Sequence, residues 1–507
     1  MDSQNNQIIG KIISTQNTPN TSECFFLVLG KIKKGQYIII RNDDLSYIAL
    51  VNELFSANKY FERPETVMDY EKVIDISSHF PTDEWDYTIA NCRIFGIFDN
   101  EKKSFERAYV PPKPGDYVIE INNELLEKFL GFVEDGLNIG TLNNHNVNVR
   151  VDLNRLLQKH LAVLAMSGAG KSYLTSIIIE ELLNRKKEQG RIGIVLIDVH
   201  GEYKFLKNIY PKNVEVYDAE KFRISLKKIN SLLISEWIEG ITVPQLREFE
   251  NILNEFKKNA KIEMKPFGLT DIEQKVLELE AKTQKKEIKN LYPLIKNLKS
   301  LKLFAFSEKP LLKDIVKPGK LVIFDFSNLT NERTKQIIVH YICLNLFKLR
   351  KKNSICPFLL VIEEAHNFAK EKAHKYISIP KSAIETIARE GRKFGASLLL
   401  ISQRPVKLST TALSQCNTHI IMRISNPFDQ RHIEESAEGI DQYVINSLPN
   451  LHVGEAIIVG EATNYPVMFK VRKRNYENKK TEISLKELAI KFEEALEQNK
   501  KDVEAFI

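Results

Sequence analysis

Between residue 6 and residue 121 the chain alternates short apolar runs with turn residues. We expect strands at residues 8–14, 24–29, 37–41, 47–54, 72–77, 87–98 and 116–121. Short strands at this spacing, with no helical period between them, predict a small closed or sandwiched β-domain. An Asn-rich stretch, residues 137–148, is expected to be a linker, so that residues 1–150 form the first domain with its linker.

From residue 159 the pattern changes to apolar strand, turn and helix, which is typical of a mostly parallel sheet covered by helices. We expect core strands at 161–166, 192–198, 320–326, 357–363, 396–402 and 418–424. A helix at 171–186 separates the first two strands, and a helix at 331–350 joins the third and the fourth. Two further strands at 454–460 and 466–472 precede a basic cluster, Arg472-Lys473-Arg474, and a last helix at 483–499. The predicted fold class is therefore α/β.

A long segment rich in Leu, Ile, Glu and Lys separates the second and third core strands. A crossover between parallel strands needs only about a dozen residues, so the segment predicts an inserted helical subdomain. The expected domains are then a core at 151–219 and 313–475, a helical insertion at 220–312 and a helical tail at 476–507.

Composition limits the class of protein. The chain has 507 residues, 43% of them hydrophobic and 27% charged, which is ordinary globular composition of about three domains. It shows neither an apolar run of about 18–20 residues nor a secretion signal, so we expect no membrane span and a cytoplasmic location. The five cysteines, at 24, 92, 343, 356 and 416, contain no CxxC pair. Structural zinc and a disulfide framework are therefore not expected.

The charge is unevenly distributed. Residues 1–150 carry 15 Lys and Arg against 22 Asp and Glu, a net charge of −7, and residues 151–507 carry 58 against 44, a net charge of +14. A polyanionic partner, if the protein has one, is expected to meet the second part of the chain. An ordinary solvated, lysine-rich surface explains the same excess equally well.

A phosphate-binding loop is the most specific motif. Ala165-Met166-Ser167-Gly168-Ala169-Gly170-Lys171-Ser172 follows an apolar strand and opens a helix, which is the context of a P-loop. Its glycines let backbone N–H groups surround phosphate oxygens at a helix N-terminus. Lys171 would reach the β- and γ-phosphates and Ser172 would bind Mg²⁺. The motif's first Gly is replaced by Ala165. We assign ATP binding to Ser167, Gly168, Ala169, Gly170, Lys171, Ser172 and Tyr173.

Acidic side chains end two of the apolar strands. Glu363 is expected to hold Mg²⁺ through water, where Asp is the commoner choice, and Glu364 to orient and deprotonate the attacking water. Asp198 ends another strand; a supporting role near the metal and a purely structural one are equally compatible with its position. Gln403 ends the fifth core strand and would sense the γ-phosphate at the ligand crevice.

Arg389 lies near the end of a predicted helix, where cations favour the helix dipole. The same position suits an arginine that stabilises transition-state charge in a neighbouring subunit. From the residues alone the dipole explanation is the simpler one.

Together these motifs resemble the HerA family of hexameric ATPases, within the HerA/FtsK group of DNA-pumping motors. The resemblance extends from Ile9-Gly10-Lys11-Ile12 to residues 448–460 and includes the P-loop, residues 198–203, Glu363 to His366, residues 389–395 and residues 401–405. It implies a RecA-like P-loop ATPase core, a helical insertion and an N-terminal small β-barrel like that of ATP synthase subunits. Glu363 adds a methylene to the usual aspartate, which puts the distance to the metal in question.

The family resemblance also implies a homohexamer with ATP and Mg²⁺ at sites shared between subunits. Arg389 then becomes the trans arginine finger, and Lys159 the basic residue near the nucleotide. Archaeal family members work with a NurA-type nuclease in DNA end resection and double-strand-break repair, whereas bacterial relatives pair with effector enzymes in antiphage defence. The barrel would be the docking face for such a partner.

Three classes of function follow. The first is an ATP-driven, ring-shaped translocase or helicase on double-stranded DNA that feeds a partner nuclease. The second is a nucleotide-gated scaffold, such as the ATPase subunit of an antiphage defence complex, which has the same motifs but moves no DNA. The third, a small-molecule kinase, fits poorly because no substrate lid is recognisable.

Overall fold

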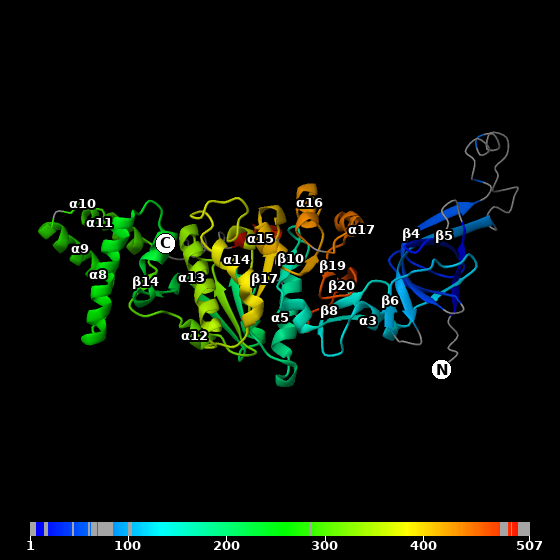
Figure 1. Cartoon of the computed structure of the whole chain (residues 1–507), viewed down its shortest axis with the longest axis horizontal. Coiled ribbons are helices and arrows are strands. Elements are labelled where there is room, and N and C mark those ends of the chain that lie inside the picture. Colours follow the sequence, from blue (N-terminus) through cyan, green and yellow to red (C-terminus); the bar gives the residue numbers. More distant parts are fainter. Residues whose placement is uncertain are drawn as a thin grey trace, which may run out of the picture.

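The chain is elongated, with a β-barrel at one end, a large sheet in the middle and a group of helices at the other end (Figure 1). The computed structural model describes residues 7–14, 19–42, 45–58, 61, 68, 85–99, 104–283, 285–437, 439–476, 485–487 and 489–494. Among these residues, no helix has both the length and the apolar character needed to cross a bilayer.

Seven strands form the N-terminal unit: β1 (Ile8–Ile13), β2 (Glu23–Val28), β3 (Tyr37–Arg41), β4 (Ser46–Asn58), β5 (Asp86–Asp99), β6 (Ser104–Glu106) and β7 (Tyr117–Glu120). They pair in the order β2-β1-β7-β3-β4-β5-β6, and β2 also pairs with β5. That last pairing closes six antiparallel strands into a barrel, as the strand pattern predicted, and β6 extends β5. The strand expected at 72–77 lies outside the described residues.

Alternate residues of β3 point to opposite faces and so serve two cores. Ile38 and Ile40 lie inside the barrel. Tyr37 and Ile39 belong to a second cluster that includes Phe469 of the large sheet. The barrel is therefore packed against the central unit through one outer face.

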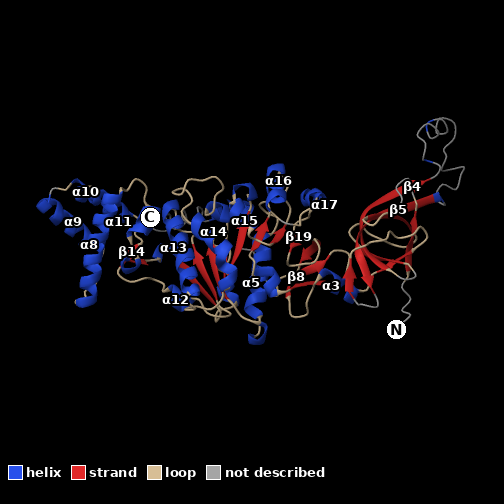
Figure 2. Ribbon diagram, viewed as in Figure 1, coloured by secondary structure: helices blue, strands red, loops and turns tan. Residues whose placement is uncertain are grey.

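The central unit is built on one mixed sheet, visible as the long row of strands in Figure 2. Its strands run in the order β12-β15-β11-β16-β17-β10-β18-β19-β20-β8-β9. The pairings from β12 to β18 are parallel and those from β18 to β9 are antiparallel. The parallel strands are β10 (Leu161–Leu164), β11 (Gly193–Asp198), β12 (Val214–Asp218), β15 (Leu321–Asp325), β16 (Phe358–Ile362), β17 (Ala396–Ser402) and β18 (Thr418–Ile421).

The expected linker at 137–148 is wrong, because this stretch contributes to the sheet. β8 (Leu137–Leu142) pairs with β9 (Asn148–Val151) and with β20 (Val467–Val471), which follows β19 (Glu455–Gly460). Buried Leu137, Ile139 and Leu142 hold β8 in the core. The asparagines flank these apolar positions and do not abolish the strand pattern.

Helices cover both faces of the sheet. All four residues of β10 are fully buried. On one face of the sheet, Leu161 and Val163 pack with α5 (Lys171–Asn184). On the other face, Ala162 and Leu164 belong to the same hydrophobic cluster as α13 (Glu332–Lys351) and α14 (Lys381–Glu390). Burial on both faces is typical of parallel strands. The shorter helices of this unit are α3 (Asn123–Leu130), α4 (Leu153–Leu157), α6 (Leu206–Ile209), α12 (Leu312–Ile315), α15 (Thr410–Ser414), α16 (Pro427–Ser436) and α17 (Gln442–Ser447).

Residues 220–312 contain the helices α7 (Ser231–Trp237), α8 (Val243–Ile262), α9 (Leu269–Thr283), α10 (Lys286–Lys289) and α11 (Leu291–Ser300), with a small parallel pair, β13 (Ile224–Ser225) and β14 (Phe304–Ala305). Thr242 begins α8 through a capping box with Gln245. Trp237 Nε1 donates a hydrogen bond to His340 Nδ1 at 2.9 Å, which attaches this unit to α13. Residues 485–487 and 489–494, within the expected last helix, are helical.

Candidate functional site

The P-loop lies between β10 and α5, at the carboxyl ends of the parallel strands. Gly168 and Gly170 have φ angles of 77° and 109°, in the left-handed region that glycine adopts without strain. A Cβ on Gly170 would also lie 3.1 Å from Met422 Cε. Ser167 and Gly168 are exposed and α5 begins at Lys171, so backbone N–H groups and a helix N-terminus are available to phosphate.

Ala165, which replaces the first glycine of the motif, fits its position. It is fully buried and does not have a positive φ angle. Its backbone N–H donates to Ser402 O at 3.2 Å. The loop therefore leaves the strand at this point in a conformation that an L-residue adopts freely.

Lys171 and Glu364 face each other across the site, with Lys171 Nζ 4.0 Å from Glu364 Oε1. Glu364 follows β16 with φ 48° and ψ 45°, a left-handed conformation that is unusual for glutamate and typical of functional positions. Its Oε2 atom is buried and has no hydrogen-bond partner within the described residues. Burial raises the pKa of Glu364, opposed by Lys171, His200 and a hydrogen bond with Gln403. A buried acceptor beside the P-loop lysine suits a group that binds and deprotonates water.

The carboxyl groups of Glu363 and Asp198 lie next to each other, at the ends of the neighbouring strands β16 and β11. Burial, and then the charge of Asp198, raise the pKa of Glu363 to about 9. Asp198 accepts backbone hydrogen bonds from Gly201 at 2.7 Å, Glu202 at 3.0 Å and Tyr203 at 3.0 Å. Asp198 therefore fixes the turn after β11, which gives it a structural role.

The donor set fits Mg²⁺. The hydroxyl of Ser172 and the carboxylate of Glu363 are hard oxygen ligands, and a cation would favour the ionised form of Glu363, whose pKa is raised first by burial and then by the charge of Asp198. The described residues contain no cluster of three or more His, Cys, Asp or Glu that could hold a metal ion.

Gln403 comes next to this site because β17 lies between β10 and β16. Ser402, at the end of β17, bonds through Oγ to His366 Nδ1 at 3.1 Å, and His366 Nδ1 lies 3.3 Å from Glu364 Oε2. Burial lowers the pKa of His366 to about 4, so this imidazole is neutral near pH 7. No role was predicted for His366 from the sequence, although its position two residues after Glu364 was visible there.

Arg389 and Lys159 lie at the opposite edge of the sheet. The His160 ring, just before β10, forms hydrogen bonds with Ala388 O at 2.9 Å and with the Leu398 N–H at 3.0 Å. Because Arg389 follows Ala388, the exposed Arg389 lies beside the amino-terminal ends of β10 and β17. Lys159 precedes β10 and forms an ion pair with Glu461. Neither cation is therefore brought to the P-loop of its own chain.

Tyr173 and the basic cluster after β20 form a feature that the sequence did not predict. Tyr173 projects from the first turn of α5, and the Arg474 backbone N–H donates to its hydroxyl at 3.0 Å. The cluster itself was visible in the sequence, but its contact spans 301 residues and no local pattern indicated it.

Residues 137–346 match the family model described as "Helicase HerA, central domain". The match begins at Leu137, the first residue of β8. A probable helicase of Methanocaldococcus jannaschii is 29% identical, with 92% of this chain and 91% of the relative covered. The DNA double-strand break repair helicase HerA of Saccharolobus solfataricus is 27% identical, with 92% of each chain covered. Among solved structures, VirB4 of Thermoanaerobacter pseudethanolicus superimposes with a TM-score of 0.53 and 15% identity, over 68% of this chain and 98% of that one.

Proposed function

We propose that this chain, whose residues 137–346 match the HerA central domain, is a P-loop ATPase that hydrolyses ATP with Mg²⁺ to drive double-stranded DNA through a homohexameric ring. One observation carries the proposal: Lys171 Nζ, at the end of a glycine-rich loop, lies 4.0 Å from Glu364 Oε1. The curated relatives named as DNA double-strand break repair helicases support DNA as the polymer.

The reaction uses groups that the parallel strands bring to one edge. Lys171 and the N–H groups of the P-loop bind the β- and γ-phosphates. Ser172 and Glu363 would hold Mg²⁺, which would neutralise phosphate charge. Glu364 orients the attacking water and accepts its proton, and Gln403 contacts the same carboxylate, so that it responds to the γ-phosphate.

A shared site follows from the position of Arg389. The P-loop occupies the carboxyl edge of the sheet, whereas Arg389 and Lys159 occupy the amino edge. In a head-to-tail ring these two edges meet between neighbouring subunits. We therefore propose Arg389 as the finger that stabilises transition-state charge in trans, with Lys159 near the same nucleotide.

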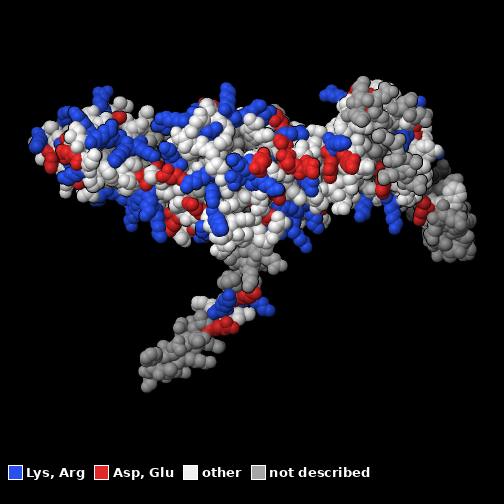
Figure 3. Space-filling model, turned by 90° about the horizontal axis from the view of Figure 1, so that it is seen from below, with Lys and Arg blue, Asp and Glu red and all other residues white. Residues whose placement is uncertain are grey.

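DNA contacts are proposed at the loop that follows β16. A hollow of about 950 Å³ opens beside Gln403, with Lys370, Lys372, Arg404 and Lys407 on its wall and Glu371 and Glu435 also present. Lys and Arg side chains also cover much of the helical insertion and central unit (Figure 3). Contacts of this kind with phosphates are independent of sequence and sensitive to salt.

The barrel is the proposed docking face for a partner enzyme. It packs on the central unit through one outer face and an ion pair between Arg93 and Asp441, the N-cap residue of α17, and its part of the sequence is net acidic. A NurA-type nuclease in DNA end resection is the partner that the family implies. The proposed units are the barrel, the ATPase core from β8 onward, the helical insertion and the C-terminal tail.

The deciding experiment measures ATP hydrolysis and triplex displacement by the purified full chain, with and without linear duplex DNA. We expect DNA to stimulate hydrolysis, and Glu364→Gln and Arg389→Ala to abolish it, whereas Lys393→Ala, an exposed cation on the turn after α14, leaves it unchanged. Hydrolysis that ignores DNA and displaces no triplex, even with a nuclease partner, would contradict the motor and favour a scaffold in a defence complex. Full activity of Arg389→Ala would contradict the shared site alone.

A further inference from the structure

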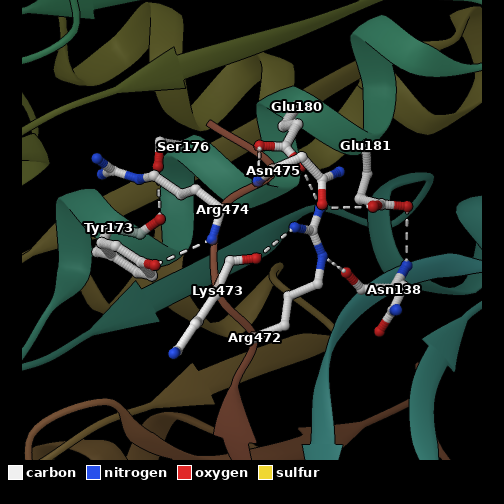
Figure 4. Close-up of polar contacts among 9 residues, drawn as sticks. All are labelled: Asn138, Tyr173, Ser176, Glu180, Glu181, Arg472, Lys473, Arg474 and Asn475. Carbon is white, nitrogen blue, oxygen red and sulfur yellow. Dashed lines mark hydrogen bonds and ion pairs between the residues drawn. The ribbon is translucent and has the colours of Figure 1, made fainter. Parts of the chain in front are cut away.

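Residues 472–476, here called the C-terminal strap, follow β20 and lie against α5 (Figure 4). Arg472 fixes the strap at the middle of the helix: its Nη2 donates to Glu180 Oε1 at 2.7 Å and to Glu181 Oε1 at 2.6 Å. Its Nε donates to Asn138 O in β8 at 2.7 Å. These charge-assisted bonds are mostly shielded, with the Arg472 side chain only 12% exposed, so they anchor the strap firmly.

Arg474 lies at the end of α5 that carries the P-loop. Its guanidinium carbon is 4.2 Å from the centre of the Tyr173 ring, 5.2 Å from Phe205 and 5.8 Å from Tyr476. Its Nε atom is buried and has no hydrogen-bond partner in the part of the chain that the structure describes. Tyr173 remains 38% exposed. The result is a platform of one guanidinium and one accessible ring.

The platform stands on the side of the P-loop away from Glu364. Lys171 faces Glu364, and side chains two residues apart on a helix do not share a face, so Tyr173 points elsewhere. A nucleotide with its terminal phosphate between Lys171 and Glu364 extends its nucleoside in the other direction. Gly454 connects the P-loop to the end of β20, where the strap begins: its N–H donates to Ala169 O at 3.4 Å, and its carbonyl accepts from Val471 N at 2.8 Å.

We propose that Tyr173 and Arg474 form the nucleoside subsite of the ATP site. The base stacks on the Tyr173–Arg474 platform. Aromatic and guanidinium planes both stack on bases, and such stacking tolerates every base because each has a π-face. The inference rests on the proposed ATPase function. It adds that the strap increases the affinity for the nucleoside part of the nucleotide, and that ATP and GTP bind with similar affinity.

The test compares ATP with inorganic tripolyphosphate, which has the phosphates and lacks the nucleoside. Binding is measured by calorimetry with Mg²⁺ on the full chain carrying Glu364→Gln, which prevents turnover. Adding Arg474→Ala is expected to weaken ATP and GTP roughly 5- to 100-fold and to leave tripolyphosphate unchanged. Lys473→Ala, which removes an exposed neighbouring cation of the strap, is the matched control and is expected to change neither ligand.

Further variants separate stacking from hydrogen bonding. Tyr173→Phe retains the ring and is expected to bind ATP nearly as well as the parent, whereas Tyr173→Ala is expected to lose affinity as Arg474→Ala does. Equal weakening of ATP and tripolyphosphate by Arg474→Ala would overturn the proposal, because the strap would then act only by shaping the P-loop. Unchanged ATP affinity would overturn it as well. If the folded parent binds neither ligand, the proposed ATPase function itself fails.

Discussion

Glu363 Oε2 accepts a hydrogen bond from the backbone N–H of Val199 at 3.0 Å. The longer side chain of glutamate, compared with the usual aspartate, thus reaches the turn that Asp198 fixes after the neighbouring strand. The extra methylene is therefore used to position the carboxylate. It does not leave the carboxylate loosely placed, which answers the question that the sequence raised about this ligand.

Shortening this residue tests the assignment. In Glu363→Asp the carboxylate retracts from Val199, and we expect the apparent Mg²⁺ affinity in ATP hydrolysis to fall about 10- to 100-fold, as it does when a supporting contact of a metal ligand is lost. Mg²⁺ titrations of phosphate release at saturating ATP measure this. Glu332→Asp, on a well-exposed acid of α13, is the control. An unchanged Mg²⁺ requirement would contradict a role for Glu363 at the metal.

Asp198 is expected to matter for stability. Its Oδ1 accepts from Gly201 and Glu202, and its Oδ2 accepts from Tyr203. Asp198→Asn retains an Oδ1 acceptor and loses the third bond, whereas Asp198→Ala leaves three N–H groups without their acceptor. We expect losses of about 1–3 kcal/mol and more than about 3 kcal/mol, respectively, in urea unfolding. Equal stability of Asp198→Ala and wild type would refute the structural role.

Features that depend on residues close together in the sequence are predicted, whereas features that depend on residues far apart in the sequence are missed. The P-loop and Glu364 follow from apolar strands that end in chemically specific residues, and parallel strands place such ends at one edge. The linker at 137–148 was misjudged because β8 joins the sheet through β20, which lies more than 300 residues later, and its local partner β9 has only four residues. The ion pair of Lys159 with Glu461 and the contact of Arg474 with Tyr173 span similar distances, so no local pattern predicts them.

Arg389 gives a prediction about shared sites. Chains with Lys171→Ala and chains with Arg389→Ala are each expected to be inactive in ATP hydrolysis. Mixed and reassembled one to one, they form some interfaces with both an intact Lys171 and an intact Arg389. Random mixing around a head-to-tail ring restores at most about a quarter of wild-type activity. Chains with both substitutions, mixed with themselves, are the control, and failure of the two single variants to complement would contradict the trans arrangement.

His160 predicts a loss of stability in acid. Its Nε2 donates to Ala388 O and its Nδ1 accepts from the Leu398 N–H, so the folded chain needs the neutral ring. Burial lowers its pKa from 6.5 to about 4. The unfolded chain takes up the proton first as the pH falls below about 6.5, so the stability present above that pH is lost progressively until about pH 4.

Between pH 7.5 and pH 5.0 this single residue accounts for about 2 kcal/mol of that loss. In His160→Asn, where asparagine tolerates the positive φ of 65°, we expect lower stability at pH 7.5 and a smaller further loss on acidification. Urea unfolding at the two pH values measures both. His374→Asn, on an exposed histidine, is expected to keep the wild-type slope. Burial also lowers the pKa of His145, His340, His366 and His419 to about 4, so His160→Asn removes only part of the acid sensitivity. A slope identical to that of wild type would show that His160 is not protonated on unfolding.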